Sequence, residues 1–169
     1  MMTKTTRALL IASAALLGCV GLGTRAASAT ATIDEYGYWA STLDTDDAGH
    51  KVCGVRTRMD GGGELRLIVI SGVVHLVVHD PQWHMRYGDS FHVAIDVDDD
   101  RFHGSGQAVD SQTLLVESLS DDFLGQFIDG SQMVANFGGV RWRVSLSGSS
   151  RATGDMGSCL AIAKRALSS

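Results

Sequence analysis

The chain has 169 residues, of which 19 are acidic and 14 basic, and its isoelectric point is about 5.6. A net charge of −5 gives no support for nucleic acid or an anionic membrane surface as the partner. The sequence contains no nucleotide-binding glycine loop, no nucleophile elbow and no other motif that carries a reaction, so we expect no cofactor.

Residues 1–29 predict a secretory signal peptide. Lys4 and Arg7 form a basic start, and the apolar run Ala8–Val20 is shorter than the ~20 residues of a typical membrane span. Ala27-Ser28-Ala29 fits a small-residue cleavage site. Cleavage there leaves residues 30–169 with 11 basic and 19 acidic side chains, a net charge of −8. We therefore expect a periplasmic or secreted protein with no transmembrane segment in the mature chain.

An alternative lies inside the same segment. Leu16-Leu17-Gly18-Cys19 resembles a bacterial lipobox, in which the cysteine becomes a lipid-anchored N-terminus. Leu17 is an uncommon residue at its position in that motif. The other interpretation is that Cys19 is a small apolar residue of the signal core, which the cleavage site at Ala27–Ala29 favours.

Two cysteines remain in the mature chain, Cys53 and Cys159. An isolated pair in an exported protein predicts one disulfide, and the alternative is two buried free thiols. There is no Cys-x-x-Cys motif, so thioredoxin-like redox chemistry is not expected.

Alternating apolar and polar residues predict β-strands through the first half of the mature chain. The clearest hairpin joins Glu64–Ile70 to Val73–His79 through Ser71-Gly72, and it places Glu64 opposite His79. Before it, the sequence predicts strands at Thr30–Trp39 and Val52–Met59, separated by a polar turn at Asp44–Gly49.

A further strand is predicted at Phe91–Val97, with a turn at Asp98–Arg101 and a return strand that begins at Phe102. If Val97 pairs with Phe102, Asp96 faces His103. One or two more strands are expected within Gln107–Glu117.

The C-terminal part predicts a helix, a hairpin and a second helix. Ser120 caps a short helix at Phe123–Ile128. Gly138-Gly139 then forms the turn of a hairpin. The pairs expected across it are Phe137 with Val140, Ala135 with Trp142 and Met133 with Val144. The last helix is short and irregular, with an apolar stripe of Ala152, Met156, Cys159, Leu160 and Ala163.

These elements predict a mainly β fold with seven or eight short strands and two short helices, one of them C-terminal. No long helices alternate with the strands, so an antiparallel β-sandwich or flattened barrel is expected. We expect residues 30–169 to form a single domain stapled by the disulfide.

The six histidines make a metal site one candidate for the function, because imidazole is the commonest transition-metal ligand. His92, His103 and Asp96 are the candidate ligands, since they share one face of the predicted hairpin. The alternative is half-exposed sheet histidines that pair with acids, and no tight metal spacing such as His-Glu-x-x-His is present. No catalytic residue is identified. A Ser-His-Asp triad is recognised by geometry rather than spacing, so a small hydrolase stays a second alternative.

The order of short landmarks resembles small exported proteobacterial proteins of the invasion-associated locus B type. The resemblance covers most of the mature chain. It differs in that the family usually carries a central cysteine pair, which this chain lacks. The landmarks are Trp39, Cys53, His79-Asp80-Pro81-Gln82-Trp83, Ala94-Ile95-Asp96, Phe127–Met133 and Val144–Gly148 with Ala152.

This resemblance implies a periplasmic or secreted β-rich protein linked to host interaction, and it supplies no catalytic residues. Together with the acidic charge, it leads us to expect a non-enzymatic binding or accessory protein. Its expected partner is a protein or an envelope component. The alternatives are a periplasmic metal-binding protein and, after it, a small hydrolase.

Overall fold

The structure is a computed structural model that describes residues 30–46, 49–70 and 72–166. The predicted signal peptide and Cys19 lie outside the described residues. The described residues form ten strands, two α-helices and one short 3-10 turn at Asp60–Gly62. The strands are β1 (Ala31–Tyr36), β2 (Trp39–Thr45), β3 (Lys51–Arg58), β4 (Glu64–Ile70), β5 (Val73–His79), β6 (Ser90–Val97), β7 (Asp100–Ala108), β8 (Thr113–Leu119), β9 (Gln132–Phe137) and β10 (Val140–Ser145). The helices are α1 (Asp121–Asp129) and α2 (Ser149–Ala166).

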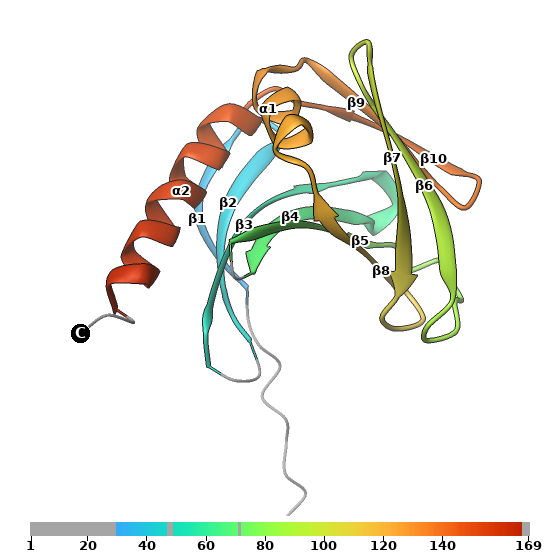
Figure 1. The fold of residues 1–169 in the computed structure, drawn as a ribbon, viewed down its shortest axis with the longest axis horizontal. Coiled ribbons are helices and arrows are strands. Elements are labelled where there is room, and N and C mark those ends of the chain that lie inside the picture. The colour runs from blue at the N-terminus through green and yellow to red at the C-terminus, as the bar shows by residue number, and fades with distance from the viewer. Residues whose placement is uncertain (1–29, 47–48, 71, 167–169) are drawn as a thin grey trace, which may run out of the picture.

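The ten strands belong to one antiparallel sheet in the order β1-β2-β3-β4-β5-β8-β7-β6-β9-β10. The first five strands follow chain order, and the sheet then runs through β8, β7 and β6 in reverse. Figure 1 shows the sheet curling around a core without closing into a barrel. The predicted class is confirmed, a mainly β, antiparallel fold with two helices.

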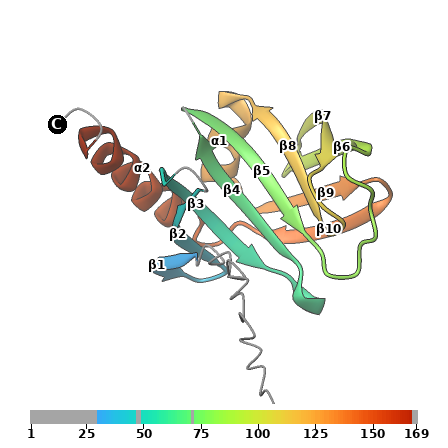
Figure 2. The ribbon, with the colours of Figure 1, turned by 90° about the horizontal axis from the view of Figure 1, so that it is seen from below.

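The core occupies the inner face of the curled sheet. Side chains alternate along each strand, so one apolar set points inward and a mostly polar set points outward. Figure 2 shows the outer side of β3, β4 and β5, with β9 and β10 lying behind them. The inward residues that the structure buries most completely include Val55, Leu65, Leu67, Leu76, Val78, Val97, Met133 and Ala135.

The two edges of the sheet approach each other at one end. Trp39 at the start of β2 donates a hydrogen bond from Nε1 to the carbonyl oxygen of Ser145 at the end of β10, at 2.8 Å. Just beyond β10, Gly148 has a φ of +96°, and a Cβ there would lie 1.8 Å from the carbonyl oxygen of Tyr36. Only glycine allows this close approach of the two edges.

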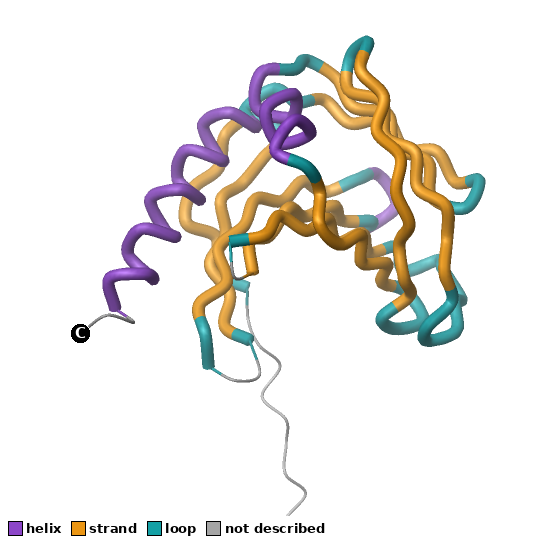
Figure 3. The backbone as a smooth tube through the Cα atoms, in the orientation of Figure 1, coloured by secondary structure: helices purple, strands orange, loops and turns teal. Residues whose placement is uncertain are grey.

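The two helices lie next to each other (Figure 1 and Figure 3), with α2 along the β1–β2 end of the sheet and α1 beside the start of α2. α1 starts at the predicted cap, since the Ser120 hydroxyl accepts a hydrogen bond from the Phe123 amide at 3.1 Å. Its buried Phe127 packs edge-on against Trp39, with ring centroids 4.8 Å apart.

α2 covers β1, β2 and β3 and is linked to them by polar and covalent bonds. Cys159 on α2 is joined by a disulfide to Cys53 on β3, as the sequence predicts. Asp155 accepts a hydrogen bond from the Tyr36 hydroxyl at 2.5 Å and one from Ser41 at 3.4 Å. The bond to Asp155 is the main cause that raises the pKa of Tyr36 to about 12. The helix spans 18 residues, so it is longer than expected despite Gly154 and Gly157.

Two predicted hairpins have the predicted register. Glu64 lies opposite His79 across β4 and β5, and Ile68 lies opposite His75. Across β9 and β10, Phe137 pairs with Val140, and the other two expected pairs form as well. A glycine-containing turn and a single apolar face were enough to specify both registers.

Two other predictions need correction. The segment expected as one strand at Thr30–Trp39 contains a turn at Gly37, with a φ of +64°, so it divides between β1 and β2. The β6–β7 turn is tighter than expected, because Val97 pairs with Asp100 rather than with Phe102.

Asp98 explains the tighter turn. It adopts a φ of +48°, which aspartate tolerates better than most residues. Its carboxylate accepts hydrogen bonds from the amide and hydroxyl of Ser131 at 2.9 and 2.7 Å and from the amide of Gln132 at 3.0 Å. The bonds from Ser131 lower the pKa of the Asp98 carboxyl. A contact with a segment far along the chain therefore fixes the turn.

Candidate functional site

The structure places two of the three candidate metal ligands side by side on the outer face of β6 and β7. The rings of His92 and His103 stack with centroids 5.6 Å apart. Asp96 does not face His103 but lies opposite Arg101, because of the tighter turn. Within the described residues, no group of three or more histidine, cysteine or acidic side chains is placed to hold a metal ion.

Asp96 is instead held by Arg101. The Arg101 Nε and Nη2 atoms donate to the two carboxylate oxygens at 2.5 and 3.1 Å. These bonds lower the pKa of Asp96 and raise that of Arg101. The charges of Asp96 and Arg101 cancel each other at the surface. Arg101 is therefore not the partner of the neighbouring acidic side chains of α1.

A second polar cluster occupies the outer face of β2, β3 and β4. Asp44 forms an ion pair with Arg66, and Glu64 accepts a hydrogen bond from Arg56 at 3.0 Å. Burial lowers the pKa of Arg66. Each arginine has an acidic partner, so this cluster functions as a cross-strand ion-pair network that ties the sheet together.

The sheet is split open between β7 and β8. In the part of the chain that the structure describes, the ladder between these strands joins only Gly106, Gln107 and Ala108 to residues 114–116. On its other side, β8 carries a bulge, because the pairing with β5 shifts between Leu76–Val116 and Val74–Leu119. Ser118 lies in this bulge with a φ of +58°. The bulge bends β8 away from β7 and toward α1.

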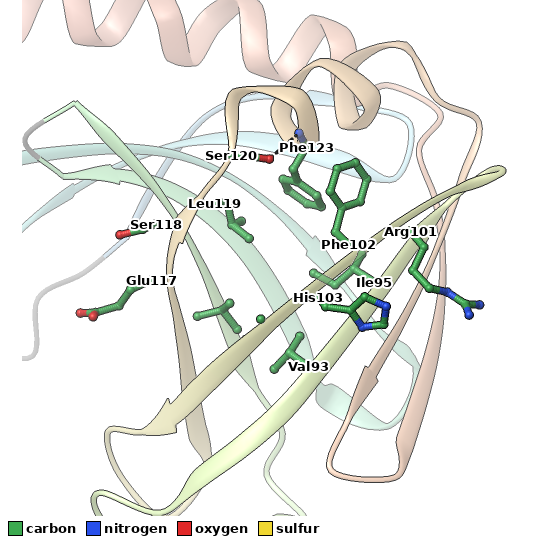
Figure 4. Close-up of a pocket in the computed structure, with 12 residues that line it drawn as sticks. Val93, Ile95, Arg101, Phe102, His103, Glu117, Ser118, Leu119, Ser120 and Phe123 are labelled. Carbon is green, nitrogen blue, oxygen red and sulfur yellow. Dashed lines mark hydrogen bonds between the residues drawn. The ribbon is translucent and has the colours of Figure 1, made fainter.

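A cavity of about 300 Å³ fills the opening. Its inner lining is apolar and belongs to the core: Val93 is 1% exposed, Ile95 2% and Phe123 1%. Phe102 contacts Phe123 edge-on at a centroid distance of 5.3 Å. Leu119 closes the side next to α1 (Figure 4). The opening therefore has core side chains at its floor and the half-buried Phe102 and Leu119 along its walls.

The polar residues of the cavity lie at its rim. Figure 4 shows the side chains of Arg101 and Glu117 pointing away from the opening in opposite directions. Gly104 occupies an inward position on β7, between Phe102 and Gly106, yet it is exposed. A Cβ on Gly104 would meet only Val116, at 3.8 Å. The missing side chain of Gly104 is thus part of what leaves the cavity empty.

A polar hollow of about 490 Å³ adjoins the apolar cavity at the α1 end and shares Arg101 and Phe102 with it. Because Arg101 is paired with Asp96, the hollow carries excess negative charge. Its acidic residues are Asp100, Asp121, Asp122 and Asp129. Together the two hollows offer an apolar site with an acidic extension.

Among the described residues, no hydrogen bond joins a serine hydroxyl of the cavity lining to the imidazole of His103. Ser120 is used as the helix cap, and His103 stacks on His92. Among the described residues, one hydrogen bond joins an imidazole to a hydroxyl side chain, between His79 and Thr113 at 3.3 Å. That pair lies at the other end of β8 from the cavity.

The sequence contained weak signals for this site. Gly104 falls at an inward position of a predicted strand, where an apolar side chain is expected. Ser118 gives no sequence signal of its bulge, because serine is common in regular strands and in turns alike. The opening could therefore be found only once the strand pairing was known.

The fold resembles that of a solved bacterial protein. The crystal structure of invasion associated protein B from Bartonella henselae superposes with a TM-score of 0.54 at 15% sequence identity, over 79% of this chain and 99% of that one. The fold therefore matches the family that the sequence landmarks resemble. No family model and no curated protein sequence matches the chain. In the described part of the chain, no helix has the length and apolarity to cross a membrane.

Proposed function

We propose that this protein is an exported, non-enzymatic binding protein that takes an apolar group of its partner into the opening between β7 and β8. The observation that carries the proposal is the apolar cavity, in which core residues such as Val93 and Ile95 form the floor and the half-buried Phe102 and Leu119 form the walls. Pockets of a few hundred Å³ with an apolar lining and a polar rim are typical ligand sites. Burying one leucine-sized side chain there would contribute ~1.5–3 kcal/mol.

The export part of the proposal rests on the N-terminal sequence and on the disulfide. Cys53 and Cys159 are bonded, and such bonds persist in oxidising compartments. Residues 1–29 are the predicted signal peptide, with Cys19 as the alternative lipid anchor. The fold is that of an invasion associated protein. This likeness supports the proposal that the partner is an envelope or host component.

The cavity can be tested by filling it. A Gly104→Val variant places a side chain in the opening without backbone strain, since the position has an ordinary φ and nothing closer than 3.8 Å. We expect the neutral fluorophore N-phenyl-1-naphthylamine to bind the mature protein with increased fluorescence, and to bind Gly104→Val at least tenfold more weakly, because the added methyl groups occupy its place.

The matched control is Ser105→Val on the same strand. Ser105 is exposed and points to the outer face, so the same β-branched side chain is added away from the cavity. Ser105→Val is expected to bind the fluorophore like the wild type. Equal binding by Gly104→Val and the wild type would contradict the proposal, provided that both unfold at the same urea concentration.

A further inference from the structure

The backbone of β7 has an open edge along the cavity. The Ala108 amide donates to the carbonyl oxygen of Asp89 at 2.8 Å, whereas the next amide, that of Val109, donates to Thr113 next to β8 at 2.9 Å. Successive residues of a strand present their backbone groups to opposite sides. The pairing of β7 with β6 is regular from Asp100 to Gln107, so this parity extends back along the strand.

The parity assigns the backbone groups that face the opening. Those of Arg101, His103 and Ser105 point toward β8, on the same side as those of Val109. In the described chain, β8 pairs with β7 only at Gly106–Ala108, and this pairing reaches the carbonyl of Ser105, so the groups that no strand covers are those of Arg101 and His103. A row of free N–H and C=O groups on an exposed strand is a template for another strand.

The cavity lies where a side chain of such an added strand would point. In an antiparallel pair, directly opposed residues project to the same face of the sheet. A residue opposite Gly104 would therefore project inward, into the space that Gly104 leaves empty above Val93 and Val116. Its neighbour opposite His103 would project outward and would exchange both backbone hydrogen bonds with His103.

Charge sets the chemistry of the added segment. A strand antiparallel to β7 ends beside Asp100, where the acidic hollow with Asp121 and Asp122 begins. The mature chain has 11 basic and 19 acidic residues, so the wider surface also attracts cations. A lysine or arginine a few residues after the apolar one would lie at this hollow.

We propose that the partner inserts an extended peptide segment, an apolar residue followed a few positions later by a basic one, as a strand on the open edge of β7. This proposal rests on the proposed function, because it identifies the ligand of the same cavity. The backbone bonds to β7 supply affinity that is independent of sequence, and the cavity and the acidic hollow supply the sequence preference.

The test uses the peptide acetyl-Thr-Leu-Thr-Thr-Thr-Lys-amide and the ¹⁵N-labelled mature protein. We expect chemical-shift changes that are largest at the amides of Arg101 and His103, and slower hydrogen exchange of the same amides. N-methylation of the threonine after leucine removes the donor opposite His103 and is expected to weaken binding at least tenfold. N-methylation of leucine, whose amide points away from β7, is the control and is expected to change binding by less than about threefold.

Two further arms complete the test. Replacing the lysine of the peptide by glutamate is expected to weaken binding severalfold, and Gly104→Val is expected to weaken binding of the unmodified peptide at least tenfold.

If the two N-methylated peptides bind equally well, strand addition is wrong. If the fluorophore binds the cavity but the peptide produces no shifts on β7, this inference fails while the proposed function stands. If neither binds, the proposed function fails as well.

Discussion

Removal of the Cys53–Cys159 bond is expected to lower the free energy of unfolding by about 5 kcal/mol. The bond joins β3 to α2 over a sequence separation of 106 residues. Closing so long a loop restricts the unfolded chain, and the chain-entropy model gives ~4.7 kcal/mol for a loop of about 100 residues. Because a typical domain is stable by only ~5–15 kcal/mol, this is a large share of the total.

The measurement is urea unfolding of the oxidised wild type and of the double variant Cys53→Ala/Cys159→Ala. Alanine avoids leaving a buried hydroxyl at Cys53, whose side chain is fully buried. The control is the wild type after reduction and alkylation, and the intact mass before alkylation is expected to rise by two hydrogens on reduction. A loss below about 1 kcal/mol in the double variant would contradict the structural role of the bond.

Trp39→Ala is expected to lower the free energy of unfolding by about 3–5 kcal/mol, the usual range for removing a buried aromatic side chain. Trp39 is 1% exposed, contacts Phe127 of α1 edge-on at 4.8 Å and bonds to Ser145 of β10 at 2.8 Å. It therefore connects the two edges of the open sheet and the first helix. Its removal leaves a cavity at the point where the sheet comes nearest to closing.

Trp39→Phe separates the ring packing from the hydrogen bond. The phenyl ring keeps most of the apolar contact but leaves the carbonyl of Ser145 without its donor. We therefore expect the free energy of unfolding to fall by about 1–3 kcal/mol. Urea unfolding of both variants at neutral pH gives the two values. If Trp39→Ala costs no more than Trp39→Phe, the ring does not hold the edges together and this account of the fold is wrong.

The sequence predicted local pairing well and long-range pairing poorly. The hairpins around Ser71-Gly72 and Gly138-Gly139 were predicted with their register, because turn glycines and alternation act within a few residues. The β6–β7 turn was placed wrongly, since Asp98 is fixed by Ser131, which lies 33 residues further along the chain. The position of β8 between β5 and β7 also depends on contacts that alternation does not encode.

The candidate site shows the same division. His92 and His103 were expected on one face and do stack there, but the shifted turn places Asp96 opposite Arg101, which binds it. The opening between β7 and β8 was not predicted, because it arises from the bulge at Ser118. A bulge is a mismatch between two strands, and it becomes visible only when both partners are known.

The most direct test of the opening as the ligand site is to locate a bound probe within it. Intermolecular NOEs between N-phenyl-1-naphthylamine and an isotope-labelled protein of residues 30–169 identify the side chains in contact. We predict NOEs to the rings of Phe102 and Phe123 and to the methyl groups of Val93 and Leu119, all of which line the cavity. NOEs confined to other exposed apolar residues, such as Tyr38 or Tyr87, would show that the probe binds elsewhere and that the opening is not a binding site.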